Sequence, residues 1–241
     1  MGSFFNKVFL NISDPHRLGR NVKAILKKLS ANTYEFFVVI FLTIKIYRKY
    51  IKLRVPLTQI LMLDTAINVT RALEERNIDY YLIGGSLLGA IRQQAFAGRP
   101  SDFDIAIKEQ DWQRVLSMHP KFAEMGLSVK DHTSIRLDKT SYGGVVHIWP
   151  RSLRPKTRWG MIDIHVHEQV GEQWRFKYSD PHLDEVPKFQ ILLDFPKQSE
   201  LKIGKIFGYL FPIPTNYEEY LLKAFGEHWR IPVGYKEYYL R

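Results

Sequence analysis

The chain has 241 residues, a hydrophobic fraction of 45% and a charged fraction of 25%, which are the proportions of a globular protein with one substantial core. A formal net charge of +10 favours anionic partners such as nucleotides, lipid headgroups or phosphorylated glycans, although a solvated basic surface without a dedicated partner would give the same charge. The absence of cysteine excludes disulfides, thiolate zinc sites and cysteine nucleophiles, and it fits a cytoplasmic location.

The N-terminal part, residues 1–55, is predicted to be a basic, partly apolar helical segment that precedes a main domain at residues 56–241. A secretory signal is not expected there, because the first apolar run comes late and no small-residue cleavage site follows it. Its apolar run Phe36–Ile44 (FFVVIFLTI) is well short of the roughly 20 residues that span a bilayer. Cations flank this run within residues 27–54. The pattern suits a helix lying in an anionic membrane interface, or a helix buried on the main domain with its lysines reaching solvent.

The next elements follow in chain order. Asn32 begins a predicted helix that runs toward Leu53, and Pro56 marks the border of the main domain. Leu57–Arg76 is an amphipathic helix ending near Asn77. Its apolar stripe at helical spacing consists of Ile60, Leu63, Ile67, Thr70 and Leu73.

A strand, a glycine turn and a helix are predicted next, at Tyr80–Ile83, Gly84–Ser86 and Leu87–Arg92. The strictly alternating Ser101–Ile107 (SDFDIAI) is a second strand. The remaining expectations are a helix near Glu109–Met118, strands at Ser134–Leu137, Gly144–Trp149 and Gly160–Val166, and a last helix at Tyr217–Phe225 between Pro214 and Gly226. Mixed helices and strands predict an α/β or α+β fold.

Two carboxylates carry the clearest chemical signal. Side chains alternate between the faces of a strand, so Asp102 and Asp104 share one face while Phe103 and Ile105 point to the other. Paired carboxylates repel each other unless a cation joins them. Because oxygen ligands suit hard cations that also bind substrate phosphates, the pair predicts a site for Mg²⁺ or Mn²⁺.

The glycine turn predicts a phosphate-binding element. Gly84 and Gly85 let backbone N–H groups approach a phosphate, and the helix N-terminus adds a favourable dipole. Ser86 offers a hydroxyl, and Arg92 can reach an anion if it faces the site. We therefore predict that Gly85, Ser86 and Arg92 bind the phosphates of a substrate or cofactor.

A third carboxylate, Asp163, lies in another alternating stretch, MIDIHVH. If its strand neighbours that of Asp102 and Asp104, the three carboxylates form one site that can organise two metals, one at the acceptor oxygen and one at the leaving phosphate.

Two histidines share the face of Asp163. His165 or His167 can act as a general base, although two partly exposed strand histidines would give the same pattern. A zinc site built from these residues, with His147 as a further ligand, is a third interpretation. The C-terminal aromatics Tyr217, Tyr220, Phe225 and Trp229 are expected to pack in the core rather than stack on bases.

Two stretches resemble the LicD and fukutin-related phosphotransferases. The stretch Gly84–Ile107 (GGSLLGAIRQQAFAGRPSDFDIAI) is similar to the Gly-Gly-Ser/Thr-Leu-Leu-Gly-Ala-x-Arg run of that family and its Asp-x-Asp strand. Pro212–Trp229 (PIPTNYEEYLLKAFGEHW) is similar to its closing motif, and Asp163 matches a later strand carboxylate. The resemblance covers about Leu57 to Trp229.

The resemblance implies a nucleotidyltransferase-like mixed sheet flanked by helices, with residues 56–241 as the catalytic domain. It implies a metal-dependent enzyme with Asp102, Asp104 and Asp163 as catalytic and metal-binding residues. This enzyme would transfer a phosphorylated alcohol such as phosphocholine, ribitol phosphate or glycerol phosphate from a CDP-linked donor to a sugar hydroxyl of a glycan or glycolipid. The expected location is cytoplasmic, with peripheral contact at the inner face of a membrane.

Two alternatives stay open beside this reading. One is a nucleotidyltransferase acting on a small molecule or sugar phosphate. The other is a catalytically degenerate, membrane-docked binding module. Nucleic acid is disfavoured as a partner because no base-reading motif is present.

Overall fold

In the computed structural model, the described residues are 31–53, 55–98, 100–131, 144–153, 160–176 and 202–232. The helices are α3 Ala31–Tyr50, α4 Leu57–Glu74, α5 Gly84–Arg92, α6 Trp112–Ser117, α7 His119–Glu124 and α8 Tyr217–Phe225, with short 3-10 helices η1 Ile51–Leu53 and η2 Glu109–Asp111. The strands are β1 Tyr80–Leu82, β2 Asp102–Lys108, β3 Leu127–Asp131, β4 Val145–Pro150, β5 Met161–Val170, β6 Gln173–Phe176, β7 Lys202–Ile206 and β8 Tyr209–Ile213.

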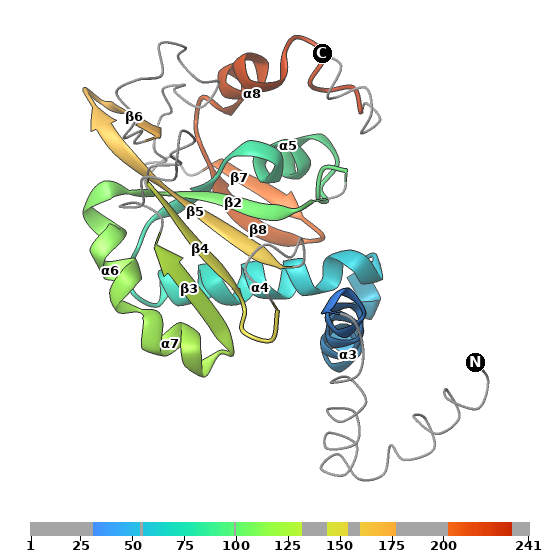
Figure 1. The fold of residues 1–241 in the computed structure, drawn as a ribbon. Helices are drawn as coiled ribbons and strands as arrows, with labels where there is room; N and C mark the ends of the chain where they lie inside the picture. Colours follow the sequence, from blue (N-terminus) through green and yellow to red (C-terminus); the bar gives the residue numbers. More distant parts are fainter. Residues whose placement is uncertain are drawn as a thin grey trace, which may run out of the picture.

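Within these residues, one six-stranded mixed sheet forms the centre of the fold (Figure 1). Its strand order is β1-β2-β5-β4-β3, and β6 pairs with the far end of β5. The β2–β5 pair is parallel, whereas the other pairs are antiparallel. The predicted α/β architecture, a mixed sheet flanked by helices, is confirmed.

The core is built from the apolar face of each alternating strand. Ile105 of β2 and Ile164 of β5 are fully buried, and α4 packs against both strands. All five residues of the predicted α4 stripe are buried, which confirms the amphipathic helix. Because these alternate positions fill the core, the remaining positions of β2 and β5 must point to the opposite face.

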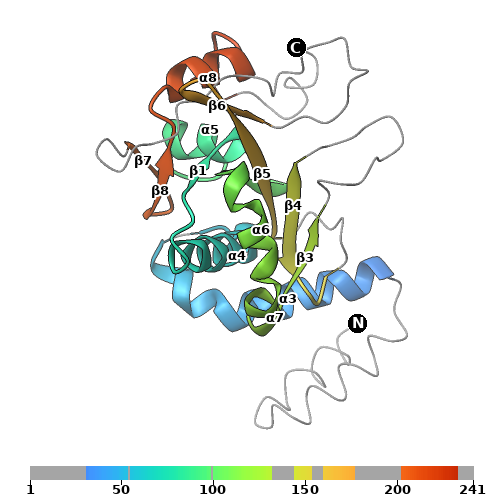
Figure 2. The ribbon, with the colours of Figure 1, turned by 90° about the vertical axis from the view of Figure 1, so that its left-hand side faces the viewer.

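A separate two-stranded sheet, β7–β8, lies beside the main one and contacts α5 and β1. Gly204 of β7 has no room for a side chain, because a Cβ there would lie 2.9 Å from Ile213 Cγ2 and 3.0 Å from Ala90 Cβ. This close approach fixes α5 between the hairpin and β2. In both views α5 and α8 lie at one end of the molecule and α3 at the other (Figures 1 and 2).

Most predicted elements are present with small shifts at their ends. The last helix has the predicted bounds, and Gly226 ends it at φ 81°. The helix α5 begins one turn earlier than expected, since Gly84–Ser86 form its first turn. The predicted strand Ser134–Leu137 lies outside the described residues, and β3, β6 and the β7–β8 hairpin were not expected.

The N-terminal helix was predicted to run from Asn32 toward Leu53, and α3 with η1 covers this range. One face of α3 packs against α4. Among the helices that the structure describes, none combines the length and apolarity needed to cross a bilayer.

Candidate active site

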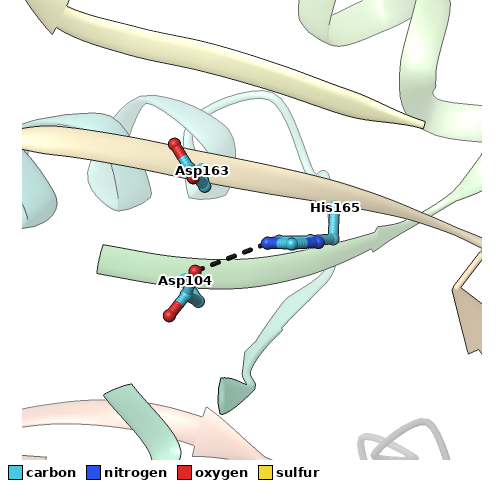
Figure 3. Close-up of side chains that lie close together, drawn as sticks. All are labelled: Asp104, Asp163 and His165. Carbon is cyan, nitrogen blue, oxygen red and sulfur yellow. Dashed lines mark hydrogen bonds and ion pairs between the residues drawn. The ribbon is translucent and has the colours of Figure 1, made fainter. Parts of the chain in front are cut away.

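The parallel pairing of β2 with β5 determines the geometry of the site. Asp104 is the direct register partner of Asp163, and Ala106 is the partner of His165. Residues in register on neighbouring strands point to the same face of a sheet. The two carboxylates and the imidazole therefore gather on one face, as Figure 3 shows.

Three side chains approach closely enough to share a cation. One ligand atom each from Asp104, Asp163 and His165 lies within 4.8 Å of the other two. His165 Nε2 is 3.4 Å from Asp104 Oδ1. Two carboxylate oxygens and an imidazole nitrogen form a ligand set that transition metals such as Mn²⁺ accept more readily than Mg²⁺ does.

The carboxylate of Asp163 is short of partners. Its Oδ1 atom is buried without a hydrogen bond among the described residues, and the imidazole Nε2 of His147 lies 3.7 Å away. A buried carboxylate oxygen with an unfilled partner position is costly for the metal-free protein. The donor set and this unsatisfied oxygen together fit a divalent cation.

Asp102 lies at the edge of this group. It begins β2 on the face of Asp104, but the three-ligand set does not include it. Burial, followed by the charge of Asp104, raises the pKa of Asp102 to about 6. The structure therefore places Asp102 within electrostatic reach of the other two carboxylates rather than in direct contact with both.

The charges of the site are strongly coupled. Burial and then the charge of Asp104 raise the pKa of Asp163 to about 8. Burial lowers the pKa of His165, but its hydrogen bond to Asp104 and the three surrounding carboxylates outweigh this effect, so the net shift is upward. The site is therefore prepared to carry positive charge, supplied by a proton or a cation.

These shifts predict how the stability of the metal-free protein depends on pH. The folded state retains a proton on Asp163 up to about pH 8, whereas the unfolded chain loses it near pH 4. The free energy of unfolding should therefore fall as the pH rises through this range. Above about pH 6.5 the raised pKa of His165 acts in the same direction, because the folded state then holds a proton that the unfolded chain loses.

Replacing Asp163 with Asn should reduce this loss and stabilise the metal-free protein at about pH 8.5, by roughly 5 °C or more in Tm, because each kcal/mol moves the Tm of a domain of this size by about 2–4 °C. Thermal unfolding in the presence of a chelator, measured from about pH 4 to about pH 8.5, gives the pH profile of each protein. Parallel pH profiles for the wild type and Asp163→Asn would contradict the assigned burial of this carboxyl.

The glycine turn lies directly against the carboxylates. Gly84 has φ 55°, and a Cβ on it would lie 2.9 Å from Asp104 Oδ2, so any side chain there would strain the backbone and press on the carboxylate. Ser86 is buried and its Oγ accepts a hydrogen bond from the backbone N–H of Asp104. A Cβ on Gly85 would meet nothing within 4 Å, so open space adjoins this position.

Arg92 is placed away from this cluster. It ends α5, so it lies about 12 Å along the helix axis from Gly84. Its Nη1 donates to the carbonyl oxygen of Trp229, 3.4 Å away, and its other nitrogens contact Gln93. In this position Arg92 connects α5 to the C-terminal segment.

Three contributors to the site have weak signals in the sequence. His165 joins the carboxylates, His147 approaches Asp163, and the hydroxyl of Tyr220 accepts a hydrogen bond from the N–H of Gly84 at 3.0 Å. For His165 the available signal was its alternation with Asp163. For His147 and Tyr220 no local signal exists, because their positions depend on the register of β4 and on the packing of α8.

His167 has a different role from its neighbour. It is buried, and its Nδ1 lies 2.7 Å from the hydroxyl of Tyr81. Burial and the charge of His165 lower the pKa of His167 to about 3, so it is neutral at physiological pH.

The predicted core role of the C-terminal aromatics is confirmed for Tyr220 and Trp229, which are both buried.

Comparison with solved structures gives similarity at low sequence identity. The antibiotic-resistance factor ANT(2'')-Ia in solution shares 15% identity at a TM-score of 0.34, covering 55% of this chain and 61% of that one. Lincomycin-bound lincosamide antibiotic adenylyltransferase LnuA shares 16% sequence identity at a TM-score of 0.39, and the match covers 66% of this chain and 83% of that one. ANT(2'')-Ia in complex with adenylyl-2''-tobramycin shares 14% sequence identity at a TM-score of 0.37, and the match covers 64% of this chain and 70% of that one. Comparison with curated proteins gave no match.

The family comparison is more informative. A family model described as LicD/FKTN/FKRP, nucleotidyltransferase domain, matches residues 77–199, which is just over half of the chain. The matched region contains the glycine turn, the β2 carboxylates and Asp163. The chain therefore belongs to the LicD family of phosphotransferase- and nucleotidyltransferase-like domains.

Proposed function

We propose that the protein is a metal-dependent phosphotransferase. It moves a phosphorylated alcohol from a CDP-linked donor to a sugar hydroxyl of a glycan or glycolipid. The observation that carries this proposal is the pairing of Asp104 with Asp163 and His165 beside the open space at Gly85. The first 55 residues form a helical segment in this proposal, and residues 56–241 form the catalytic domain.

Each part of the site has a role in this reaction. Asp104, Asp163 and His165 hold the cation, which when bound neutralises charge on the donor phosphates and the leaving group. Asp102, which lies on the same face of β2 as Asp104, is available as a ligand for a second cation. The N–H groups at the start of α5 receive phosphate oxygens in the space beside Gly85.

The atoms of the transfer balance without a further reactant. The acceptor hydroxyl oxygen forms a bond to the phosphorus that carries the alcohol, and the bond from that phosphorus to CMP breaks. The hydroxyl proton passes to a carboxylate of the site, with Asp163 or Asp102 as the acceptor. We propose Mn²⁺ ahead of Mg²⁺ because His165 adds a nitrogen ligand.

The products of the reaction test this proposal. With CDP-choline, CDP-ribitol or CDP-glycerol labelled separately in the base and in the alcohol, we expect CMP to be released while the alcohol label moves to the glycan. Retention of the base label on the acceptor would instead establish nucleotidyl transfer. Absence of both turnover and metal-dependent nucleotide binding would support the catalytically degenerate binding module.

A further inference from the structure

The helix α3 has one face packed on the domain. Val39 is buried with Leu61 of α4 and with Trp149 and Leu153, at and just after the end of β4, and Tyr50 belongs to the main core. The hydroxyl of Tyr50 donates to Asp64 of α4 at 2.5 Å. These contacts fix the rotation of α3 about its axis, so its opposite face must point to solvent.

That opposite face carries a continuous exposed stripe with two halves. Its first half is apolar, since Ile40, Phe41 and Ile44 keep 37%, 56% and 61% of their surface exposed. Its second half is cationic, because Lys45 and Arg48 are exposed about one and two helical turns after Phe41. Phe41, Ile44, Lys45 and Arg48 follow helical spacing, so they share one face.

The charge of this stripe is unbalanced. Residues 37–53 contain no acid. Lys49 forms an ion pair with Asp64 at 2.8 Å, whereas no carboxylate of the described residues pairs with Lys45, Arg48 or Lys52. An exposed phenylalanine and two isoleucines beside such cations are unfavourable in water but match a surface with apolar depth and anionic headgroups.

We propose that the exposed stripe of α3 and the following η1, from Ile40 to Lys52, docks the protein on an anionic lipid bilayer. Ile40, Phe41 and Ile44 enter the headgroup–acyl boundary, while Lys45, Arg48 and Lys52 contact lipid phosphates. The helix lies in the plane of the interface. This narrows the sequence-based expectation for residues 27–54 to one exposed face of α3 and η1.

Docking through this face leaves the carboxylate cluster accessible. In both views α3 runs along one end of the molecule, whereas α5, whose first residue adjoins Asp104, lies at the other with α8 (Figures 1 and 2). The lipid contact therefore uses none of the residues of the candidate active site. Loss of docking and loss of catalysis are distinguishable in the same preparation of protein.

Sedimentation of the full chain with vesicles tests the proposal. The wild type should bind vesicles of phosphatidylcholine mixed with phosphatidylglycerol, bind pure phosphatidylcholine poorly, and lose affinity as salt is added. The double variant Phe41→Ser/Ile44→Ser should bind at least about tenfold more weakly, because each buried apolar side chain contributes about that factor. Lys45→Glu/Arg48→Glu should remove the preference for phosphatidylglycerol.

A matched control uses another exposed apolar pair. Ile203 and Leu210 on the β7–β8 hairpin are 48% and 63% exposed. Ile203→Ser/Leu210→Ser should bind vesicles like the wild type. Metal-dependent nucleotide binding should be unchanged in every variant, which also shows that each one folds.

Two results would overturn the proposal. One is vesicle binding that is absent in the wild type or equal in the α3 and hairpin variants. The other is a concentration-dependent dimer, detected by light scattering, that Phe41→Ser/Ile44→Ser dissociates, since the stripe would then be a contact between two copies of the chain.

Discussion

Asp104→Asn should lower turnover by about a thousandfold or more while the protein stays folded. A bound cation supplies several kcal/mol of charge stabilisation in the transition state, and each 1.36 kcal/mol is a factor of ten in rate. Asp104 contributes one of the three ligand atoms and also contacts His165 at 3.4 Å. Initial rates with saturating donor and Mn²⁺ measure the loss.

The substitution preserves shape, so the expected effect is chemical. Asn has nearly the volume of Asp but no negative charge, and its side chain binds cations weakly in comparison. The backbone N–H of Asp104 still donates to Ser86 Oγ, so the contact between β2 and α5 remains. Circular dichroism and Tm should confirm an intact fold.

Asp79→Asn provides the matched control. Asp79 is an exposed carboxylate that pairs with Lys108 at 3.0 Å, away from the three-ligand group. Removing a surface ion pair changes stability little. Its activity should equal that of the wild type. Turnover of Asp104→Asn within a few-fold of this control would remove Asp104 from the metal site.

Gly89→Ala should be the most damaging small substitution in α5. A Cβ at this position would lie 2.3 Å from the carbonyl oxygen of Ala95 and 2.6 Å from the backbone nitrogen of Ala97. Both are backbone atoms that cannot rotate away, so the loop after α5 must move. Such overpacking costs about 3 kcal/mol, which lowers the Tm of a domain of this size by roughly 6–12 °C.

Gly85→Ala separates this steric effect from a loss of function. Gly85 lies four residues earlier on the same helix, and a Cβ there meets nothing within 4 Å. The variant should be as stable as the wild type, because Ala is favoured over Gly in helices. Its KM for the donor should rise about tenfold, since the methyl group occupies the space proposed for phosphate.

Thermal unfolding and steady-state kinetics of the two variants check both statements. Equal Tm values would show that the Ala95–Ala97 loop adapts to the added methyl group. An unchanged KM in Gly85→Ala would place the donor phosphate elsewhere.

The sequence predicted the face of each site carboxylate but not their distance. Alternation along β2 and β5 requires only local geometry, so Asp104 and Asp163 could be assigned to the polar faces. Their direct pairing depends on a parallel register between strands that are separated in the chain by β3 and β4. Such a long-range register is set by the whole sheet and has no local signal.

Arg92 shows a different limit. Its position in a motif with Gly84 and Gly85 suggested a phosphate ligand, but a helix that starts at Gly84 carries Arg92 away from the carboxylates to the carbonyl of Trp229. A one-turn shift of a helix start changes which residues can reach a ligand, and the start of α5 has no clear local signal in the sequence.

The β7–β8 hairpin was missed because its pattern is weak. Lys202, Ile203 and Lys205 are exposed, and Gly204 lacks a side chain, so the strand does not show regular apolar alternation. Its position depends on packing of Gly204 against Ala90 and Ile213. Tertiary contacts of this kind outweigh local strand preference.

Calorimetric titration of Mn²⁺ into the metal-free protein, at neutral pH and with CMP present, tests the central claim most directly. The claim is that Asp104, Asp163 and His165 hold one cation together. We expect saturable binding in the wild type that is lost in both Asp104→Asn and Asp163→Asn and retained in Asp79→Asn. Equal Mn²⁺ affinity in the wild type and in either site variant would contradict a shared cation at this face of the sheet.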